Sequence, residues 1–202
     1  MHEDDELMTE VQSGSAPAFR RLVDKYERAL VSFLFLNTRD WQLAEDLTQD
    51  TLLKVYDQAW DYLPVGKFRA WMYRIARNLL IDTVRRRAHD ALVKAVQGDR
   101  DEESLLAQVA AEVVSAEETA DHRELAGHVD EILQQLPEEQ RLTFTLHHFS
   151  GLSLAEVAAV LDTSVPTTKS RLRLAREKLQ DGLKLRGFFP PDPDRRPVPE
   201  TS

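Results

Sequence analysis

The chain has 202 residues, a formal net charge of -9 and no cysteine, which excludes disulfide scaffolds, thiolate nucleophiles and Cys-ligated zinc. The longest apolar run, residues 29–36, is far shorter than the roughly 20 residues that cross a bilayer, and the acidic start of the chain does not resemble a signal peptide. The adjacent His147 and His148 would point about 100° apart on a helix and so do not suggest a metal site. We therefore expect a cytoplasmic protein with no membrane insertion, no metal and no cofactor.

Apolar residues recur at spacings of three and four up to residue 189, and no alternating strand pattern persists. This pattern predicts an all-α protein. The first predicted helix follows the turn at residues 13–15, which can cap it. Its apolar stripe consists of Phe19, Leu22, Val23, Tyr26, Leu30, Phe33 and Leu34.

The second predicted helix, residues 41–60, has two distinct faces. The face expected to be buried carries Ala44, Leu47, Thr51 and Val55. The opposite face carries Asp46, Gln49, Asp50 and Leu53, which are spaced as neighbours on one side of a helix. A leucine among acidic residues fits a partner-binding face and an ordinary solvated face equally well, because single exposed leucines are common.

The third predicted helix, residues 67–87, holds seven Lys or Arg residues and a single acid, Asp82. Its expected buried seam is Phe68, Met72, Ile75 and Leu79. A neighbouring flank carries Trp71, Arg74, Asn78 and Arg85. An aromatic ring, two guanidinium groups and an amide match what unpaired nucleic acid requires: stacking, phosphate neutralisation and hydrogen bonds to base edges. The alternative is a basic amphipathic helix in which the tryptophan belongs to the core.

A strongly acidic connector follows, because residues 99–124 contain nine acids and only two bases. Basic segments lie on both sides of it, at residues 67–87 and 166–180, so the charge pattern suggests two polyanion-facing modules joined by an acidic linker. Five of the nine prolines fall within residues 190–199, which predicts an extended, disordered tail.

Residues 152–179 have the pattern of a helix-turn-helix. Ser153 and Glu156 fit a capping box for a short helix, a three-residue turn follows, and Ser164 can cap a second helix. In such a motif the second helix reads the major groove with its first residues. The residues expected to point outward or to flank that surface are Pro166, Thr167, Lys169, Ser170, Arg173 and Arg176. The alternative is a generic helical hairpin.

Together these segments resemble a bacterial extracytoplasmic-function (ECF) sigma factor. The stretches that carry the resemblance are AEDLTQDTLLKVY (44–56), FRAWMYRIARNLLIDTVRRR (68–87) and QLPEEQRLTFTLHHFSGLSLAEVAAVLDTSVPTTKSRLRLAREKL (135–179). The helix-turn-helix alone also resembles a LuxR-type regulator that binds duplex DNA, so the first half of the chain decides the family. An enzyme acting on nucleic acid is not expected, because the sequence contains no Gly-rich phosphate loop, metal-ligand cluster or nucleophile–base pair.

The resemblance implies partners and roles. Core RNA polymerase would be bound through its largest-subunit clamp helices and its flap, and an anti-sigma factor is a further expected partner. The clamp helices would contact Asp46, Gln49, Asp50 and Leu53. The minus-ten element, melted to a single non-template strand by this helix and the loop 61–67, would contact Lys67, Trp71, Arg74, Asn78, Arg85 and Arg86. The minus-thirty-five element, read as duplex DNA, would contact Ser164, Pro166, Thr167, Lys169, Ser170, Arg171, Arg173 and Arg176.

The expected domain organisation follows from the same resemblance. Sigma region 2 would span residues 15–97, the acidic linker 98–124, the region 4 helix-turn-helix 125–186 and the disordered tail 187–202. Three residues depart from the family pattern: Asp162 and Pro166 stand where glycine is common, and Leu174 stands where arginine is frequent. These departures leave the promoter sequence and the signal-responsive regulon unspecified.

Overall fold

The computed structural model describes residues 3–97 and 120–188, and every regular element within them is helical, which confirms the predicted all-α fold. The elements are α1 (Glu3–Gln12), α2 (Ala16–Thr38), α3 (Trp41–Asp57), the 3-10 helix η1 (Ala59–Asp61), α4 (Phe68–Gln97), α5 (Ala120–Gln135), α6 (Glu138–His148), α7 (Leu154–Val160) and α8 (Val165–Leu185). Most of the predicted acidic linker and of the predicted tail lies outside the described residues, and residues 120–124 of that linker belong to α5.

The helices α2 and α3 begin at side-chain caps and bury the stripes expected of them. The side chains of Ser15 and Asp40 each accept a hydrogen bond from a backbone N–H three residues further on, at 3.3 and 2.9 Å. Such a cap stabilises a helix by about 1 kcal/mol. The predicted stripe of α2 is buried apart from Phe19 and Val23, which are partly exposed. The predicted buried face of α3 is confirmed for Ala44, Leu47, Thr51 and Val55.

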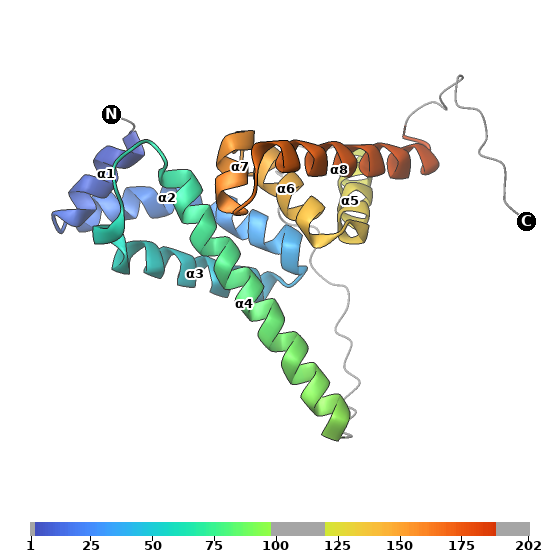
Figure 1. The fold of residues 1–202 in the computed structure, drawn as a ribbon, viewed down its shortest axis with the longest axis horizontal. Coiled ribbons are helices and arrows are strands. Elements are labelled where there is room, and N and C mark those ends of the chain that lie inside the picture. The colour runs from blue at the N-terminus through green and yellow to red at the C-terminus, as the bar shows by residue number, and fades with distance from the viewer. Residues whose placement is uncertain (1–2, 98–119, 189–202) are drawn as a thin grey trace, which may run out of the picture.

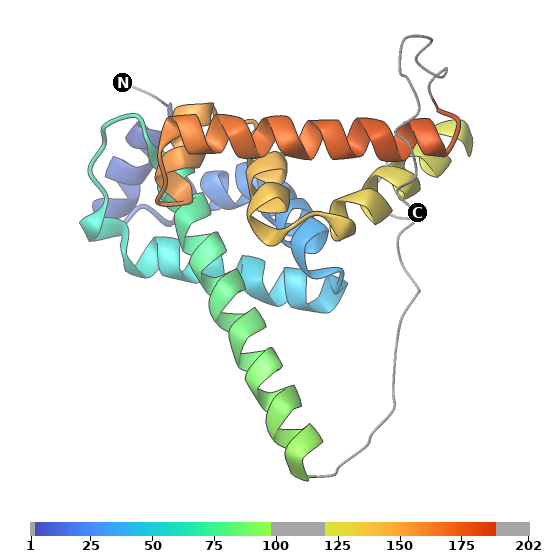
Figure 2. The same cartoon turned by 45° about the vertical axis from the view of Figure 1, so that its right-hand side comes forward.

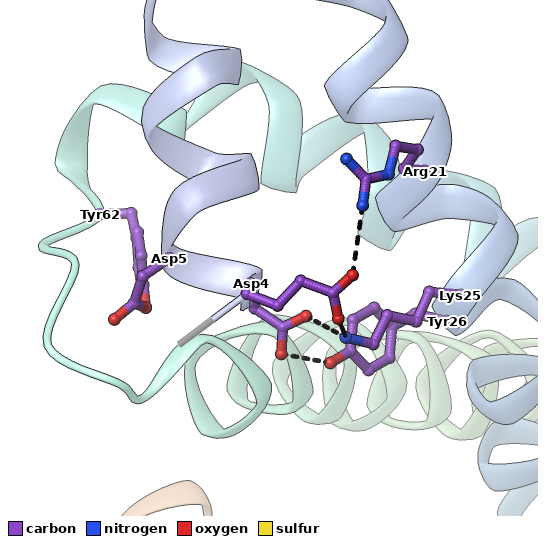
Figure 3. Close-up of polar contacts among 7 residues, drawn as sticks. Asp4, Asp5, Arg21, Lys25, Tyr26 and Tyr62 are labelled. Atoms are coloured by element: carbon purple, nitrogen blue, oxygen red, sulfur yellow. Dashed lines mark hydrogen bonds and ion pairs between the residues drawn. The ribbon is translucent and has the colours of Figure 1, made fainter. Parts of the chain in front are cut away.

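Helix α1 is an element that the sequence pattern does not predict. Ten residues are too few for a stable isolated helix, so α1 depends on its neighbours. Its buried apolar residues are Leu7, Met8 and Val11. On its outer side, Lys25 of α2 pairs with Glu3 (2.9 Å) and Asp4 (2.6 Å), and the hydroxyl of Tyr26 donates to Asp4 (2.6 Å; Figure 3). These ties fasten α1 to α2.

The helix-turn-helix is formed by α7 and α8. The predicted capping box is present, since Ser153 accepts from the backbone N–H of Glu156 and the Glu156 carboxylate accepts from that of Ser153. Ser164 caps α8 as expected. Within the turn, Asp162 adopts a positive φ of 51°, a conformation that favours glycine but that aspartate tolerates better than most residues. Because of this tolerance, the departure from the family's glycine preserves the turn.

The inner face of α8 packs against α5, α6 and α7. The four predicted inner residues, Thr168, Leu172, Ala175 and Leu179, are all buried. A Cβ atom at Gly182 would lie 2.7 Å from the Cδ1 atom of the buried Ile132 on α5. Glycine at this position therefore sets how closely α5 approaches α8.

The two halves of the molecule are packed against each other. In Figures 1 and 2, α7 lies beside the first turns of α4, whereas the second half of α4 extends away from the other helices. The larger hydrophobic core continues from α1–α4 into α6 and α7, where it includes Leu146, Leu152 and Val157. A smaller cluster, centred on Leu133 and Leu179, joins α5 to α8. The boundary between the two cores thus does not coincide with the boundary between the two predicted domains.

Polar contacts between the halves accompany this apolar packing. Gln134 of α5 donates to the backbone carbonyl of Leu36 (2.9 Å), and the Arg39 guanidinium at the end of α2 pairs with the Asp130 carboxylate. The Asn37 amide nitrogen donates to the hydroxyl of Thr145 (3.2 Å). Its amide oxygen is buried and has no partner among the described residues, which costs about 1–3 kcal/mol.

Candidate polymerase and promoter interfaces

The acidic face of α3 is fully available to a partner. Its four predicted residues, Asp46, Gln49, Asp50 and Leu53, are all exposed. The leucine side chain is 60% exposed although the opposite side of the same helix is buried. This geometry satisfies the requirement of a docking face: an apolar side chain that solvent surrounds, framed by carboxylates that a basic partner can pair with.

Two aromatic residues extend this face and are absent from the predicted set. Tyr56, three residues beyond Leu53, is 50% exposed, and Trp60 in η1 is 77% exposed. Exposed aromatic side chains are typical anchors of protein interfaces. The i, i+3 spacing from Leu53 is the sequence signal that identifies Tyr56, whereas Trp60 lies beyond the end of α3.

The predicted single-strand flank of α4 is divided in the structure. Trp71 is only partly exposed, because its ring packs against Tyr62 (5.1 Å between ring centroids) and Phe68 (6.1 Å). The indole therefore lies at the border of the core and leaves part of its ring exposed, which is compatible with both alternatives. Asn78 is exposed, and its side-chain oxygen accepts from Arg77 (3.2 Å).

The arginines of this flank turn toward the second half of the molecule. Arg74 donates from its Nη2 atom to the backbone carbonyl of Ala159 in α7 (2.5 Å). Arg85 lines a small polar cavity between α4 and α6–α8, to which Glu138 and Glu139 also contribute. Arg86 donates to Thr83 of the preceding turn (3.1 Å). The predicted line of four side chains is therefore split into an open pair, Trp71 and Asn78, and a pair that faces α6–α8.

The buried seam of α4 is also rotated from its predicted position. Phe68 and Met72 are buried as expected, whereas Ile75 and Leu79 are only partly so. The residues that replace them in the core are Tyr73, Ala76 and Leu80. The reason is that α4 packs against α2 and α3 on one side and against α7 on another, so its buried sector is wider than a single stripe.

The loop between η1 and α4 exposes apolar residues that the sequence pattern did not single out. Leu63 is 71% exposed and Val65 is 64% exposed, and Lys67 next to them is exposed as well. The loop also contains Pro64 and Gly66, so these apolar residues belong to no helical stripe. A run of apolar residues in a Pro- and Gly-containing loop is the signal that would have marked them.

The first turns of α8 present the predicted duplex-reading surface to solvent. The exposed members of the predicted set are Ser164, Pro166, Thr167, Lys169, Ser170, Arg173 and Arg176. Arg173 pairs with Glu177 one turn further on (2.6 Å), and both side chains are mainly exposed. An exposed pair of this kind is worth about 0–1 kcal/mol, so it does not hold the guanidinium away from DNA.

Two arginines of α8 differ from the rest in their partners. Arg171 is mostly buried and pairs with Glu139 of α6, so its guanidinium faces the interior side of the motif. Arg176 donates from Nε to the Nε2 atom of His148 in α6 (3.1 Å). Burial, together with the positive charges of Arg176 and of the neighbouring His147, lowers the pKa of His148. A neutral imidazole can accept this hydrogen bond, whereas a protonated one cannot.

Within the described residues, no group of three or more His, Asp or Glu side chains is placed to hold a metal ion. No described helix is long and apolar enough to cross a membrane.

Comparisons with known proteins agree with the arrangement of a helical bundle followed by a helix-turn-helix. The family model of sigma-70 region 2 matches residues 22–89, and that of sigma-70 region 4 matches residues 127–179. These two regions in this order define a sigma-70-type transcription initiation factor.

Individual relatives narrow the class. The chain is 32% identical over 186 residues to the RNA polymerase sigma-H factor of Pseudomonas aeruginosa, covering 90% of this chain and 94% of that protein. It is 28% identical over 175 residues to the ECF RNA polymerase sigma factor SigW of Bacillus subtilis, covering 87% and 94%. The solved structure of the sigma factor RpoE with the anti-sigma factor NepR from Bartonella quintana matches with a TM-score of 0.66 and 26% identity, covering 83% of this chain and 97% of that one.

The chain belongs to the ECF sigma factors, which confirms the resemblance identified from its sequence. A LuxR-type regulator is not favoured, because the first half of the chain matches sigma region 2.

Proposed function

We propose that this ECF sigma factor binds core RNA polymerase, recognises a minus-thirty-five and a minus-ten promoter element, and starts transcription of a stress- or signal-responsive regulon. The observation that carries the proposal is that one chain holds an exposed acidic face on α3, an open aromatic–amide pair on α4 and an exposed basic surface on α8. The polymerase performs the chemistry, and this chain supplies recognition. In this scheme residues 15–97 and 125–186 act as the two binding domains.

Each surface has the chemistry that its proposed target requires. The α3 face, with Asp46, Asp50 and Leu53, binds the clamp helices of the polymerase through charge and an apolar anchor. The α4 flank, with Trp71 and Asn78, stacks and hydrogen-bonds unpaired bases of the non-template strand. Lys67, Arg74, Arg85 and Arg86 contribute positive charge for its phosphates.

The α8 surface reads the minus-thirty-five duplex from the major groove. Arg173 and Lys169 lie near the start of α8, where a recognition helix contacts base edges, and Ser164 and Thr167 lie at its first turn, where backbone N–H groups favour a phosphate. Arg171 joins this surface only when its pair with Glu139 opens.

Promoter binding requires the two halves to separate. The two elements lie about 25 base pairs apart, which corresponds to roughly 85 Å along duplex DNA. Helix α8, with 21 residues, is only about 31 Å long. Packed as they are, α4 and α8 cannot reach both elements at once. Separation frees Arg74 from the Ala159 carbonyl for DNA.

We further propose an anti-sigma factor as a partner of the packed form. The similarity to RpoE, whose solved structure is a complex with the anti-sigma factor NepR, supports this proposal. The unsatisfied buried amide oxygen of Asn37 fits a contact that forms and separates, because its burial is costly only while the halves are packed.

Transcription in vitro with core RNA polymerase and libraries of randomised promoters tests this function. We expect the chain to select templates with two conserved elements and to yield transcripts that core polymerase alone does not make. Equal transcription with and without the chain, or binding to duplex DNA with no effect on initiation, contradicts the proposal.

A further inference from the structure

Helix α1 is connected by side-chain hydrogen bonds to the segment that leads into α4. Gln12 donates from its Nε2 atom to the backbone carbonyls of Ala59 (2.8 Å) and Tyr62 (2.9 Å). The Asp5 carboxylate accepts from the hydroxyl of Tyr62 and, at 2.6 Å, from the backbone N–H of Gly66. Two side chains of one short helix thus hold a loop that lies more than 45 residues further along the chain.

Asp5 is the unusual member of this set, because its residue is only 2% exposed. A buried carboxylate is costly unless hydrogen bonds replace its hydration, and here a hydroxyl and a backbone N–H lie against its two oxygens. Figure 3 shows Asp5 and Tyr62 side by side, on the side of α1 away from the Asp4–Lys25–Tyr26 cluster. The ties of Asp4 go to α2 only, whereas those of Asp5 go to the loop.

Tyr62 transmits this contact to the DNA-facing flank of α4. Its ring packs against Trp71 and Phe68, with centroids 5.1 and 5.8 Å apart. Burial, with the Asp5 hydrogen bond, raises the pKa of Tyr62, so the hydroxyl stays protonated and remains a donor at neutral pH. Directly after this tyrosine, Leu63 and Val65 are exposed to solvent although both are apolar.

We infer that Asp5 is a positioning residue for promoter opening: by fixing Tyr62 and the Gly66 turn, it holds the loop 61–67 and Trp71 in the geometry that captures a minus-ten base. This inference rests on the proposed function. A loop with exposed apolar side chains would otherwise close over them, and the positive φ of Gly66, 73°, gives the turn that the carboxylate fixes.

The test uses the full chain with core RNA polymerase and two promoter libraries, one randomised in the minus-ten element and one in the minus-thirty-five element. The variants are Tyr62→Phe, which removes the donated hydroxyl and keeps the ring, and Asp5→Asn, which keeps one acceptor oxygen and replaces the other with an NH2 group that cannot accept. Glu6→Gln is the matched control, because it makes the same carboxylate-to-amide change at an exposed position of the same helix.

We expect base preference at the captured minus-ten position to fall by about fivefold to tenfold in both variants. Preference in the minus-thirty-five library stays as in the parent, and Glu6→Gln changes neither library. A role in stability alone would lower activity on both libraries in proportion. Such a parallel loss, an unchanged minus-ten preference in Tyr62→Phe, or an equal minus-ten loss in Glu6→Gln overturns the inference.

If Asp5→Asn does not fold, Tyr62→Phe alone decides the question by the same criteria. If the parent itself selects no sequence in either library, the proposed function fails, and the positioning role fails with it. If the parent selects both elements and the variants select them equally well, the proposed function stands and only the positioning role of Asp5 is rejected.

Discussion

The two proposed DNA-binding surfaces of this sigma factor, on α8 and on α4, differ in how exposed their side chains are. The α8 surface is exposed, and its central arginine, Arg173, is held only by an exposed pair with Glu177. On α4, by contrast, Arg74 is bonded to the α7 carbonyl of Ala159, and Trp71 is packed on one side against aromatic rings. The proposed duplex-reading surface is therefore exposed, while the proposed strand-capturing surface is partly covered by the other half of the molecule.

This difference indicates an order of events. A surface that reads intact duplex is useful before the DNA is opened, whereas a surface for unpaired bases is useful only afterwards. Packing α7 against α4 leaves the first available and restrains the second.

The double change Asp50→Arg with Leu53→Ala removes the polymerase-facing surface and leaves both DNA-facing surfaces untouched. We expect a loss of core polymerase affinity of about 4 kcal/mol, roughly a thousandfold, because it reverses a charge and truncates an exposed apolar anchor. Co-purification with core polymerase measures it. Asp24→Arg on α2, an exposed residue off this face, is the control and is expected to bind normally. Undiminished binding of the double variant would remove α3 from the interface.

Arg173→Ala tests the open surface. Its loss is expected to weaken promoter binding by about 1–3 kcal/mol and to relax preference at one or two minus-thirty-five positions, because an arginine in the major groove contacts base edges. Selection from a promoter library, with the relative affinities of the selected promoters, measures both the loss of binding free energy and the change in sequence preference. Lys178→Ala, further along the same helix, serves as the control and is expected to keep the sequence preference. If Arg173→Ala selects the same sequences as the parent, Arg173 does not read bases.

Asn78→Ala tests the restrained surface. We expect closed-complex formation to stay intact while the open complex decreases about tenfold, because the lost amide contacts bases only after they are unpaired. Permanganate reactivity of thymines near the minus-ten element measures opening, and a pre-melted template is expected to restore most transcription. Asp82→Asn on the same helix is the control. Normal opening of duplex promoters by Asn78→Ala would place strand capture elsewhere.

Acidification is expected to have the smallest effect, a loss of folding stability through His148, which lies beside Arg176 of α8. The pKa of His148 is lowered, so the unfolded chain binds a proton more readily than the folded one below the usual value of about 6.5. Stability is therefore expected to decrease as the pH falls through that value, and His148→Gln should decrease less. Thermal unfolding at pH 7.5 and 5.5 measures it, with His89→Gln on α4 as the control. Equal pH dependence of His148→Gln and the parent contradicts this assignment.

The sequence predicted the buried residues correctly for helices that bury a single face. The buried sets of α3 and α8 and both caps of the helix-turn-helix follow from spacing and from local cap chemistry, and all are present. The seam of α4 was only half predicted, because its burial depends on α7, which lies about 80 residues further on. Helix α1 was missed because its stability comes from contacts with α2 and the loop rather than from its own pattern.

The same limit applies to the candidate sites. Spacing placed Trp71, Arg74, Asn78 and Arg85 on one flank, but it carries no information about which of them meet the other half of the molecule. The bond from Arg74 to Ala159, the pair of Arg171 with Glu139 and the role of Asp5 all join residues distant in the chain. Such contacts become visible only when the helices are placed in space.

The distance between α4 and α7 during initiation tests most directly whether the two halves of the molecule separate on the promoter. Because the chain has no cysteine, Asp82→Cys and Ala155→Cys, both at exposed positions, introduce a single pair of spin labels. We predict a short distance in the free protein and a distance longer by several tens of ångströms in an open complex with core polymerase, since the two promoter elements lie roughly 85 Å apart. The same short distance in an open complex that makes full-length transcript would contradict the account.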